Sequence, residues 1–340
     1  MLTLLIFATL LWPYYSMHPV RDTVTIKKPV FRSVRFADDM HGWVAGYKGI
    51  FYTNDGGKNW QKQPIIIGST TLYTSTAAVR NTGWIAWANK ELAIIRTDTG
   101  LATGKANSTS WQKIEIPSQI LERLNTIAFA NKDDGWGAGS GVVYRTRNGG
   151  YTWENVKSPA LTIVKGLFVL SPIEAWMTGE STTLLHTLDD GLTFHDQKLN
   201  SNSTADLLFI TFVTPNYGWA CGTNGLIYHT SNGGIHWKQQ PTSFSKGAYF
   251  SSLSFVNQKE GWAVGSKYIG ADSKGIELYE SIILYTLDSG STWLSLKNNI
   301  KDSLLDIQAL PNGKAWVAGM NGTVMNISSN GNFGESITLN

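Results

Sequence analysis

Hydrophobic and polar residues alternate along most of this chain in short segments, and turns rich in glycine separate the segments. In the clearest stretch, residues 218–222 read Gly-Trp-Ala-Cys-Gly, and residues 225–237 read Gly-Leu-Ile-Tyr-His-Thr-Ser-Asn-Gly-Gly-Ile-His-Trp. Alternation at period two in segments this short is typical of β-strands, and paired glycines between them are typical of hairpin turns. The stretch therefore predicts a strand, a tight turn, a second strand, a glycine-rich turn and the start of a third strand.

The same stretch recurs along the chain, with further clear copies at residues 42–60 and 135–153. The leading tryptophans of the copies are Trp43, Trp84, Trp136, Trp176, Trp219, Trp262 and Trp316. They lie 41, 52, 40, 43, 43 and 54 residues apart, so two copies are lengthened. A period of about 40–45 residues built from short strands is the length of one four-stranded propeller blade. We therefore predict an all-β fold, a seven-bladed β-propeller with four-stranded antiparallel blades.

A second motif, Thr-x-(Asp/Asn)-x-Gly-x-x-Trp, follows in most copies. An Asp or Asn side chain at its third position can accept hydrogen bonds from nearby backbone N–H groups, and glycine readily adopts the positive φ that the turn requires. We expect a structural role for the residues at this position, which are Asp55, Asn148, Asp189, Asn232 and Asp288. The aromatic residue that ends the motif is expected to open the next strand and to bury a large apolar surface between blades.

This motif resembles the Asp-box, or BNR, repeat. Together with the preceding Gly-Trp-x-x-Gly strand, it most resembles the family of photosystem II assembly and stability factors. The resemblance covers residues 30–330, and the second and seventh copies depart from the motif at residues 96–111 and 328–333. It implies a non-enzymatic propeller with a basic patch that docks a membrane-protein assembly intermediate. Sialidases and other glycosidases also carry the Asp-box, so the motif alone leaves a glycoside hydrolase open.

Composition and the start of the chain bear on the class of partner, the number of domains and the location of the protein. The net charge of the 340 residues is +3, which is too weak a bias to indicate a nucleic-acid partner. The repeat leaves no room for a second domain, so we expect residues 18–340 to form one propeller domain. Residues 1–17 contain an apolar run, Leu2–Trp12, of signal-peptide length and too short for a membrane span. We expect an exported monomer, located in the periplasm or outside the cell, or in a lumen if the source is photosynthetic.

Two insertions interrupt the period. Residues 101–110 lengthen the Asp-box turn of the second blade, and Ser266–Ser281 lengthens the connection between the second and third strands of the sixth. Successive connections in an antiparallel blade lie on opposite faces, so the sixth-blade insertion shares a face with the connections between blades, and the Asp-boxes lie on the other face. Long loops on a regular scaffold often carry function. The last blade could be completed by Thr23–Ile26 or by Ser336–Leu339, and we favour the C-terminal segment.

The residue types needed for catalysis form no recognisable group. A sialidase clamps a carboxylate with three arginines from early, middle and late blades, yet no arginine follows Arg147 and lysine is no substitute. Another glycosidase needs only two carboxylates across a cleft. Asp206 and Asp302, at the entries to inner strands, are the better placed candidates for such a role. Histidine, cysteine and acidic residues show no metal-ligand spacing, so we expect neither a metal nor a cofactor.

The remaining hypothesis is a binding surface on the face of the sixth-blade insertion. Its candidate partner-binding residues are Arg32, Arg123, Lys165, Lys246, Tyr268 and Lys274. A mildly basic rim of this kind suits an acidic protein segment, and the alternative is that these are isolated, solvated cations. We therefore expect a non-catalytic scaffold for a protein partner. An Asp-box glycoside hydrolase and a carbohydrate-binding surface module are the alternatives.

Overall fold

The computed structural model describes residues 29–46, 49–63, 73–79, 82–88, 93–97, 111–121, 123–156, 163–197, 199, 203–273, 275, 277–329, 332, 334, 337 and 339. Between residues 73 and 97 it describes the backbone of the strands and the side chain of Arg96. The apolar N-terminal run, Thr23–Ile26, the insertion at residues 101–110 and Lys274 lie outside the described residues.

The described residues form antiparallel sheets, six with four strands and one with three. The first three sheets are β1–β4 (Phe31–Phe36, Gly42–Gly46, Gly49–Thr53, Gln61–Lys62), β5–β8 (Tyr73–Val79, Thr82–Ala88, Ala93–Thr97, Gln112–Ile114) and β9–β12 (Leu124–Phe129, Gly135–Gly139, Val143–Thr146, Glu154–Val156). The next two are β13–β16 (Val164–Ser171, Glu174–Gly179, Leu184–Thr187, His195–Asp196) and β17–β20 (Leu207–Thr214, Tyr217–Gly222, Ile227–Thr230, Lys238–Gln239). The last two are β21–β24 (Ala248–Phe255, Gly261–Ala271, Glu277–Thr286, Leu294–Ser295) and β25–β27 (Leu304–Ala309, Lys314–Gly319, Val324–Ser328).

Strand order in space follows chain order in every sheet, so each sheet is a simple meander. Helical structure in the described residues is limited to α3 (Ser118–Leu121) and a short 3₁₀ turn, Met320–Gly322. Neither segment is long and apolar enough to span a membrane. These features confirm the predicted all-β fold built from antiparallel sheets.

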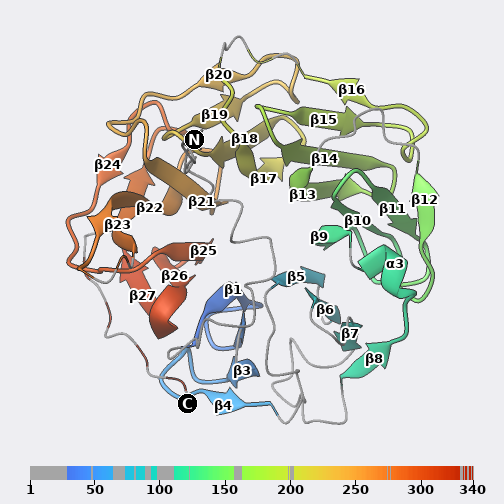
Figure 1. Cartoon of the computed structure of the whole chain (residues 1–340), viewed down its shortest axis with the longest axis horizontal. Coiled ribbons are helices and arrows are strands. Elements are labelled where there is room, and N and C mark those ends of the chain that lie inside the picture. The colour runs from blue at the N-terminus through green and yellow to red at the C-terminus, as the bar shows by residue number, and fades with distance from the viewer. Residues whose placement is uncertain are drawn as a thin grey trace, which may run out of the picture.

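The sheets stand around a central axis with their first strands innermost (Figure 1). The inner strands β1, β5, β9, β13, β17, β21 and β25 contact one another in that order, and β25 also contacts β1. The first and last sheets are therefore neighbours, and the ring is closed. Closure protects the sheet edges that an open arrangement would leave exposed.

The leading tryptophans hold neighbouring sheets together. Each lies on the second strand of its sheet, and the ring of Trp176 packs against the Asp-box glycine of the next sheet, where a Cβ atom on Gly234 would lie 2.1 Å from it. Trp219 instead donates a hydrogen bond from its indole Nε1 to the backbone oxygen of Ser289, 2.9 Å away in the next Asp-box. The two repeated motifs therefore form one interface, the tryptophan from one sheet and the Asp-box from its neighbour.

The same contact joins the last sheet to the first. A Cβ atom on Gly57 would lie 2.2 Å from the ring of Trp316, which also stacks on Phe36 with ring centroids 5.1 Å apart. Two backbone hydrogen bonds attach the C-terminal segment to β27, from Ile337 N to Val324 O (2.9 Å) and from Gly334 N to Asn326 O (2.8 Å). These contacts support the prediction that the C-terminal segment lies beside the last sheet.

A β-bulge recurs near the start of the inner strands. In the first half of β1, β9, β13, β17, β21 and β25 one residue is skipped in the pairing with the second strand, and these skipped residues are Arg32, Asn125, Lys165, Leu208, Ser251 and Leu305. The residue before each bulge pairs with the glycine that lies three residues after the leading tryptophan, as Leu207 does with Gly222. A bulge re-aims the side chain that it carries. The bulges therefore decide where two of the predicted partner-binding residues, Arg32 and Lys165, point.

Candidate protein-binding face

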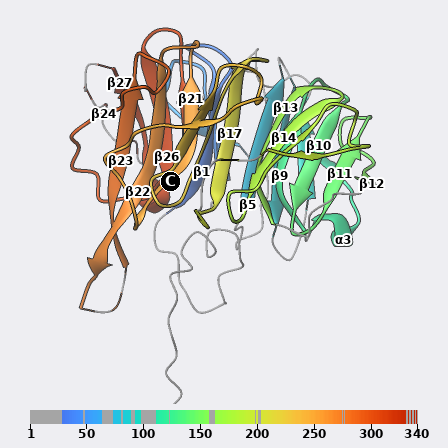
Figure 2. The ribbon, with the colours of Figure 1, turned by 90° about the horizontal axis from the view of Figure 1, so that it is seen from above.

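The sixth-blade insertion is not an irregular loop. Strands β22 and β23 continue through it and pair from Gly265–Ile282 outward to Ala271–Glu277, so the insertion is an extended β-hairpin. Figure 2 shows this hairpin projecting beyond the ring, on the side where α3 also lies. We call its outer part, residues 267–273, 275 and 277–280, the β22–β23 arm. The face of the ring from which it projects is called the arm face.

A cluster of buried hydroxyl groups fixes the base of the arm. Ser266 Oγ lies 2.7 Å from Ser303 Oγ and donates a hydrogen bond to the Tyr249 hydroxyl 3.1 Å away, and Tyr249 also bonds to Ser303. Ser266 and Ser303 are buried. The cluster ties strands β21 and β22 to the segment that enters β25. Because buried hydroxyl groups are costly to leave without partners, this network is expected to hold the arm at a fixed angle to the ring.

The arm presents apolar and aromatic side chains to solvent. The exposed fractions of Tyr268, Ile269 and Leu278 are 38%, 51% and 43%. Tyr268 contacts Tyr279 across the hairpin, with ring centroids 5.7 Å apart in an edge-to-face arrangement. The Tyr279 hydroxyl donates to Glu277 Oε2 at 2.7 Å. Burial, and then the Glu277 carboxylate, raise the pKa of Tyr279, so its hydroxyl stays protonated and remains a hydrogen-bond donor.

The structure brings together two of the residues predicted to bind a partner. Tyr268 N donates to Gly247 O at 3.0 Å, and Lys246 directly precedes that glycine, so Lys246 and Tyr268 meet at the base of the arm. Lys246 is exposed, and no described ion pair neutralises it. A positive charge beside the exposed Tyr268 suits contact with a polypeptide, because aromatic residues contribute strongly to the energetics of protein interfaces.

Arg123 is also exposed but lies elsewhere. It precedes β9, on the opposite side of the ring from the arm (Figure 1). Its guanidinium donates to the backbone oxygen of Ser140 at 2.9 and 3.2 Å, and a third bond reaches Gly141 O. These described partners are all carbonyl groups, so the positive charge of Arg123 is held in place without being neutralised. Arg123 and Lys246 do not form one patch.

At three of the bulges the side chain reaches across to the following sheet. Lys165 has only 2% of its side chain exposed, and its Nζ lies 2.6 Å from Asp206 Oδ2 of the next sheet. Asn125 and Ser251 similarly donate to backbone oxygens of the following sheet. Arg32 is half-buried at the corresponding place in β1. Lys165 therefore belongs to the contacts between sheets and not to an exposed basic rim.

The carboxylates considered for catalysis are engaged in structural bonds. Besides Lys165, Asp206 accepts a hydrogen bond from Ser181 N at 3.2 Å. Asp302 is buried and accepts from Ser303 N, the Asn321 amide and the Thr323 hydroxyl. Both carboxylates therefore take part in contacts that hold the fold together. Among the described residues, no group of three His, Cys, Asp or Glu side chains could hold a metal ion.

The Asp-box residues make the contacts expected of a structural turn. Asp288, for example, accepts hydrogen bonds from Thr286 Oγ1 at 2.9 Å and from the backbone of Thr292 at 2.8 Å. The Thr286 hydroxyl in turn accepts from Gly290 N at 2.9 Å. The corresponding residues Asp55, Asn148, Asp189 and Asn232 accept equivalent bonds. These turns lie on the face opposite the arm face.

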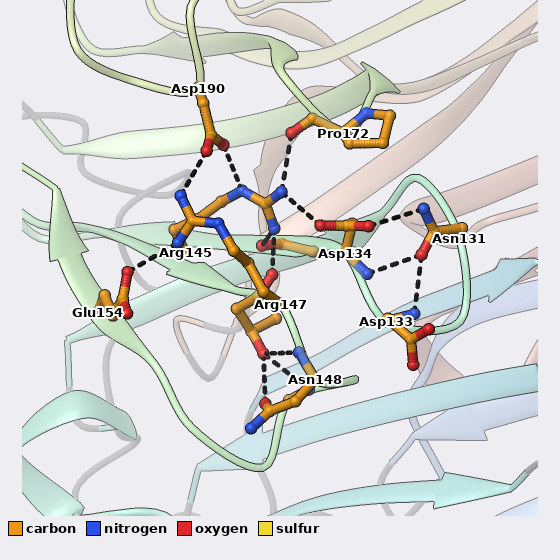
Figure 3. A network of polar contacts seen from close by, with 12 residues as sticks. Asn131, Asp133, Asp134, Arg145, Arg147, Asn148, Glu154, Pro172 and Asp190 are labelled. Atoms are coloured by element: carbon orange, nitrogen blue, oxygen red, sulfur yellow. Dashed lines mark hydrogen bonds and ion pairs between the residues drawn. The ribbon is translucent and has the colours of Figure 1, made fainter.

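An arginine network between two sheets is not among the residues predicted from the sequence (Figure 3). Arg145 is buried, and its guanidinium bonds to Asp134 and Asp190, each at 2.7 Å. Arg147 bonds to Asp190 as well and to Glu154 at 2.7 Å. Asp190 thus links the third strand of one sheet to the Asp-box of the next. The clue to this network is the pairing of the second and third strands. Arg145 pairs with the leading Trp136, and its guanidinium lies over the indole ring.

Comparison with known proteins agrees with this description. Solved structures of similar fold include a YCF48 bound to a D1 peptide (TM-score 0.67, 17% identity, covering 92% of this chain and 98% of that one). YCF48 from Cyanidioschyzon merolae is comparable (TM-score 0.67, 15% identity, 90% and 98% covered). The GH74 enzyme of Niastella koreensis shares the fold over 52% of its own length (TM-score 0.69, 11% identity, 88% of this chain).

Comparison of sequences identifies the family more specifically than comparison of folds does. No curated protein matches the chain. The family model described as "Photosynthesis system II assembly factor YCF48" matches residues 103–206 and 194–332, which together make up more than half of the chain. The resemblance predicted from the repeats is thereby confirmed, and the chain belongs to the YCF48 family of photosystem II assembly factors.

Proposed function

We propose that this protein is a non-catalytic scaffold that binds a protein partner through the arm face. The observation that carries the proposal is the β22–β23 arm, where exposed Tyr268, Ile269 and Leu278 stand beside the exposed Lys246 on a buried, hydrogen-bonded base. Rigid support beneath exposed aromatic and aliphatic side chains lowers the entropy lost on binding. We also infer that the sheets are the seven blades of a closed propeller, with the C-terminal segment completing the last one.

The partner that we infer is an extended segment of a photosystem II subunit, presented by an assembly intermediate of that membrane protein complex. A YCF48 of the same fold is described as bound to a D1 peptide. Membership of the same family supports a ligand of the same kind here. Export to a compartment outside the cytoplasm, as a monomer, is the arrangement that we propose with this function.

Binding of a fluorescent D1 peptide to the purified chain, followed by anisotropy, tests the proposal. We expect saturable binding that weakens as salt is raised, because the exposed cations of the arm face act through screened electrostatics. Lys246→Glu should weaken binding about 3- to 10-fold, the size of effect expected when one partly exposed charge is reversed. Lys238→Glu is the matched control, because Lys238 is also exposed but lies in the outer strand β20.

Three outcomes would contradict the proposal. The first is the absence of saturable binding by the unmodified chain. The second is release of reducing sugar from a panel of glycans, which would make the glycoside hydrolase the better hypothesis. An equal effect of Lys238→Glu and Lys246→Glu would be a third contradiction, because it would show that the arm face is not where the partner binds.

A further inference from the structure

The β22–β23 arm is an addition to a blade that does not need it. In the sheet β17–β20 the same connection is closed by a tight turn at Asn224 and Gly225, which have φ values of 57° and 71°. The sheet β25–β27 uses Asn321 and Gly322 with φ values of 56° and 87°. Asn-Gly is the sequence that favours a two-residue hairpin turn. The arm therefore serves no purpose in closing its own sheet.

The two strands of the arm differ as surfaces for a partner. Strand β22 is interrupted by a bulge between Tyr268 and Gly270, and Gly270 has a φ of +131°. Such a bulge bends a strand and disrupts regular pairing along it. Strand β23 continues without a register break through residues 277–280, which read Glu-Leu-Tyr-Glu. A regular, extended surface is thus present along β23 only.

The exposed residues of β23 in the arm are acidic and apolar. Glu277, Leu278 and Glu280 are all exposed. The nearest cation in the pairing is the exposed Lys267, the register partner of Glu280 on β22, and no described ion pair joins the two side chains. Successive residues of a strand point to opposite faces, so Leu278 and Glu280 share one face of the hairpin, while Glu277 and Tyr279 share the other. The face with Leu278 continues inward to Ile282 and Leu284, which pack in the core beside Trp219 and Phe250. The apolar surface of the arm is therefore continuous with the side facing the sheet β17–β20.

We infer that the outer part of β23 is the recognition strand of this protein, and that it takes an extended segment of the partner bearing a basic side chain next to an apolar one. The apolar side chain would pack on Leu278, and the basic side chain would approach Glu280 on the same face. Opposite charges on neighbouring strands, together with an apolar contact, stabilise pairing and fix its register. This inference rests on the proposed function and adds the element that binds and the chemistry that it selects.

The decisive experiment compares the unmodified chain with a variant in which residues 268–279 are replaced by Asn-Gly. Lys267 and Glu280 are register partners, so the short turn joins them directly and keeps the hydroxyl cluster beneath them. We expect an unchanged thermal midpoint and at least a tenfold loss of affinity for the D1 peptide. Equal affinity of the two proteins would overturn the inference, whereas failure of the unmodified chain to bind would count against the proposed function itself.

Single substitutions test the chemistry of the strand. Leu278→Ser and Glu280→Lys are each expected to weaken peptide binding about 3- to 10-fold, and Glu280→Lys should also make the affinity less sensitive to salt. Leu192→Ser and Glu115→Lys are matched controls, since both side chains are about 85% exposed and lie away from the arm. Tighter binding by Glu280→Lys would mean that the partner segment is acidic there, and it would overturn the assignment.

Discussion

At the scale of single residues, the third-strand position that pairs with the leading tryptophan shows how side chains pack on these indole rings. In five sheets the residue paired with the tryptophan packs against its indole ring, as His186 does on Trp176 with ring centroids 3.6 Å apart. Three of these residues also bond to an acidic side chain: Arg145 to Asp134 and Asp190, His186 to Glu174, and Tyr285 to Glu260. His229 stacks on Trp219 at 4.8 Å, but its Nε2 is buried without a hydrogen-bond partner in the described residues.

His229 should therefore make stability depend on pH. Burial lowers the pKa of His229 to about 4, against an ordinary value of 6.5. Between these values the unfolded chain binds a proton that the folded protein does not, so the free energy of unfolding falls as the pH is lowered from 6.5 towards 4. Because the ring is only partly buried, we expect a loss on the order of 1 kcal/mol. The effect fades as the pH rises above 6.5, because the unfolded chain then also loses the proton.

Urea denaturation at several pH values checks this expectation. His229→Phe keeps the stacked ring and removes the titrating nitrogen, so its stability should fall less on acidification than that of the unmodified protein. His236→Gln is the control, because His236 is exposed and should leave the pH dependence as it is. If His229→Phe and the unmodified protein lose stability in parallel, another group is responsible.

At the scale of elements, the last glycine of Gly-Trp-x-x-Gly and the inner-strand bulge depend on each other. A Cβ atom on Gly222 would lie 1.8 Å from the backbone oxygen of Asp206, and one on Gly139 would lie 1.8 Å from that of Arg123. The bulge brings the two backbones this close. In the second sheet the motif ends in Trp87 instead of glycine, and there β5 pairs with β6 without a bulge. The presence of the glycine therefore predicts the bulge.

Gly222→Ala is expected to lower the free energy of unfolding by about 2–4 kcal/mol, since the contact is with backbone that cannot move aside easily. Gly247→Ala serves as the comparison. Gly247 has a φ of +87°, but a Cβ atom there would meet nothing within 4 Å beyond its chain neighbours, so only the backbone strain of about 1 kcal/mol applies. Chemical denaturation of both variants separates the two effects. Similar losses for the two would show that the close backbone approach in β17 is unimportant.

Local pattern predicted the strands and turns well, because each is specified by residues close in sequence. The leading tryptophans lie on second strands as expected, and the Asp-box of Asp288 forms the expected turn. Contacts between distant residues could not be predicted in this way. Lys165 has the sequence context of a surface cation, and only the fold places Asp206 of the next sheet beside it. The sequence predicts a loop for the arm, because charged and glycine residues obscure the alternation that continues along its strands.

At the scale of the whole molecule, closure of the ring involves three separate sets of contacts. Trp316 packs against Gly57 and Phe36 of the first sheet. Buried Asp306 accepts hydrogen bonds from Ser33, from Val34 N and from Arg35, all in β1, and from Ser252 in β21. Gln308 bonds to both the N–H and the carbonyl of Phe36. The seam between the ends of the chain is thus joined by both apolar and hydrogen-bonded contacts.

A closed ring of this kind should unfold as one unit. The closing seam should contribute as much to the free energy of unfolding as an internal seam does. Trp316→Ala and Trp176→Ala remove equally large buried side chains from the closing seam and from an internal seam. Each is expected to lower the free energy of unfolding by about 3–5 kcal/mol while leaving a single transition in urea. If the terminal sheets instead opened independently, Trp316→Ala would leave the main transition nearly unchanged. It would then speed hydrogen exchange only in β1–β4 and β25–β27, and that result would show that closure contributes little to global stability.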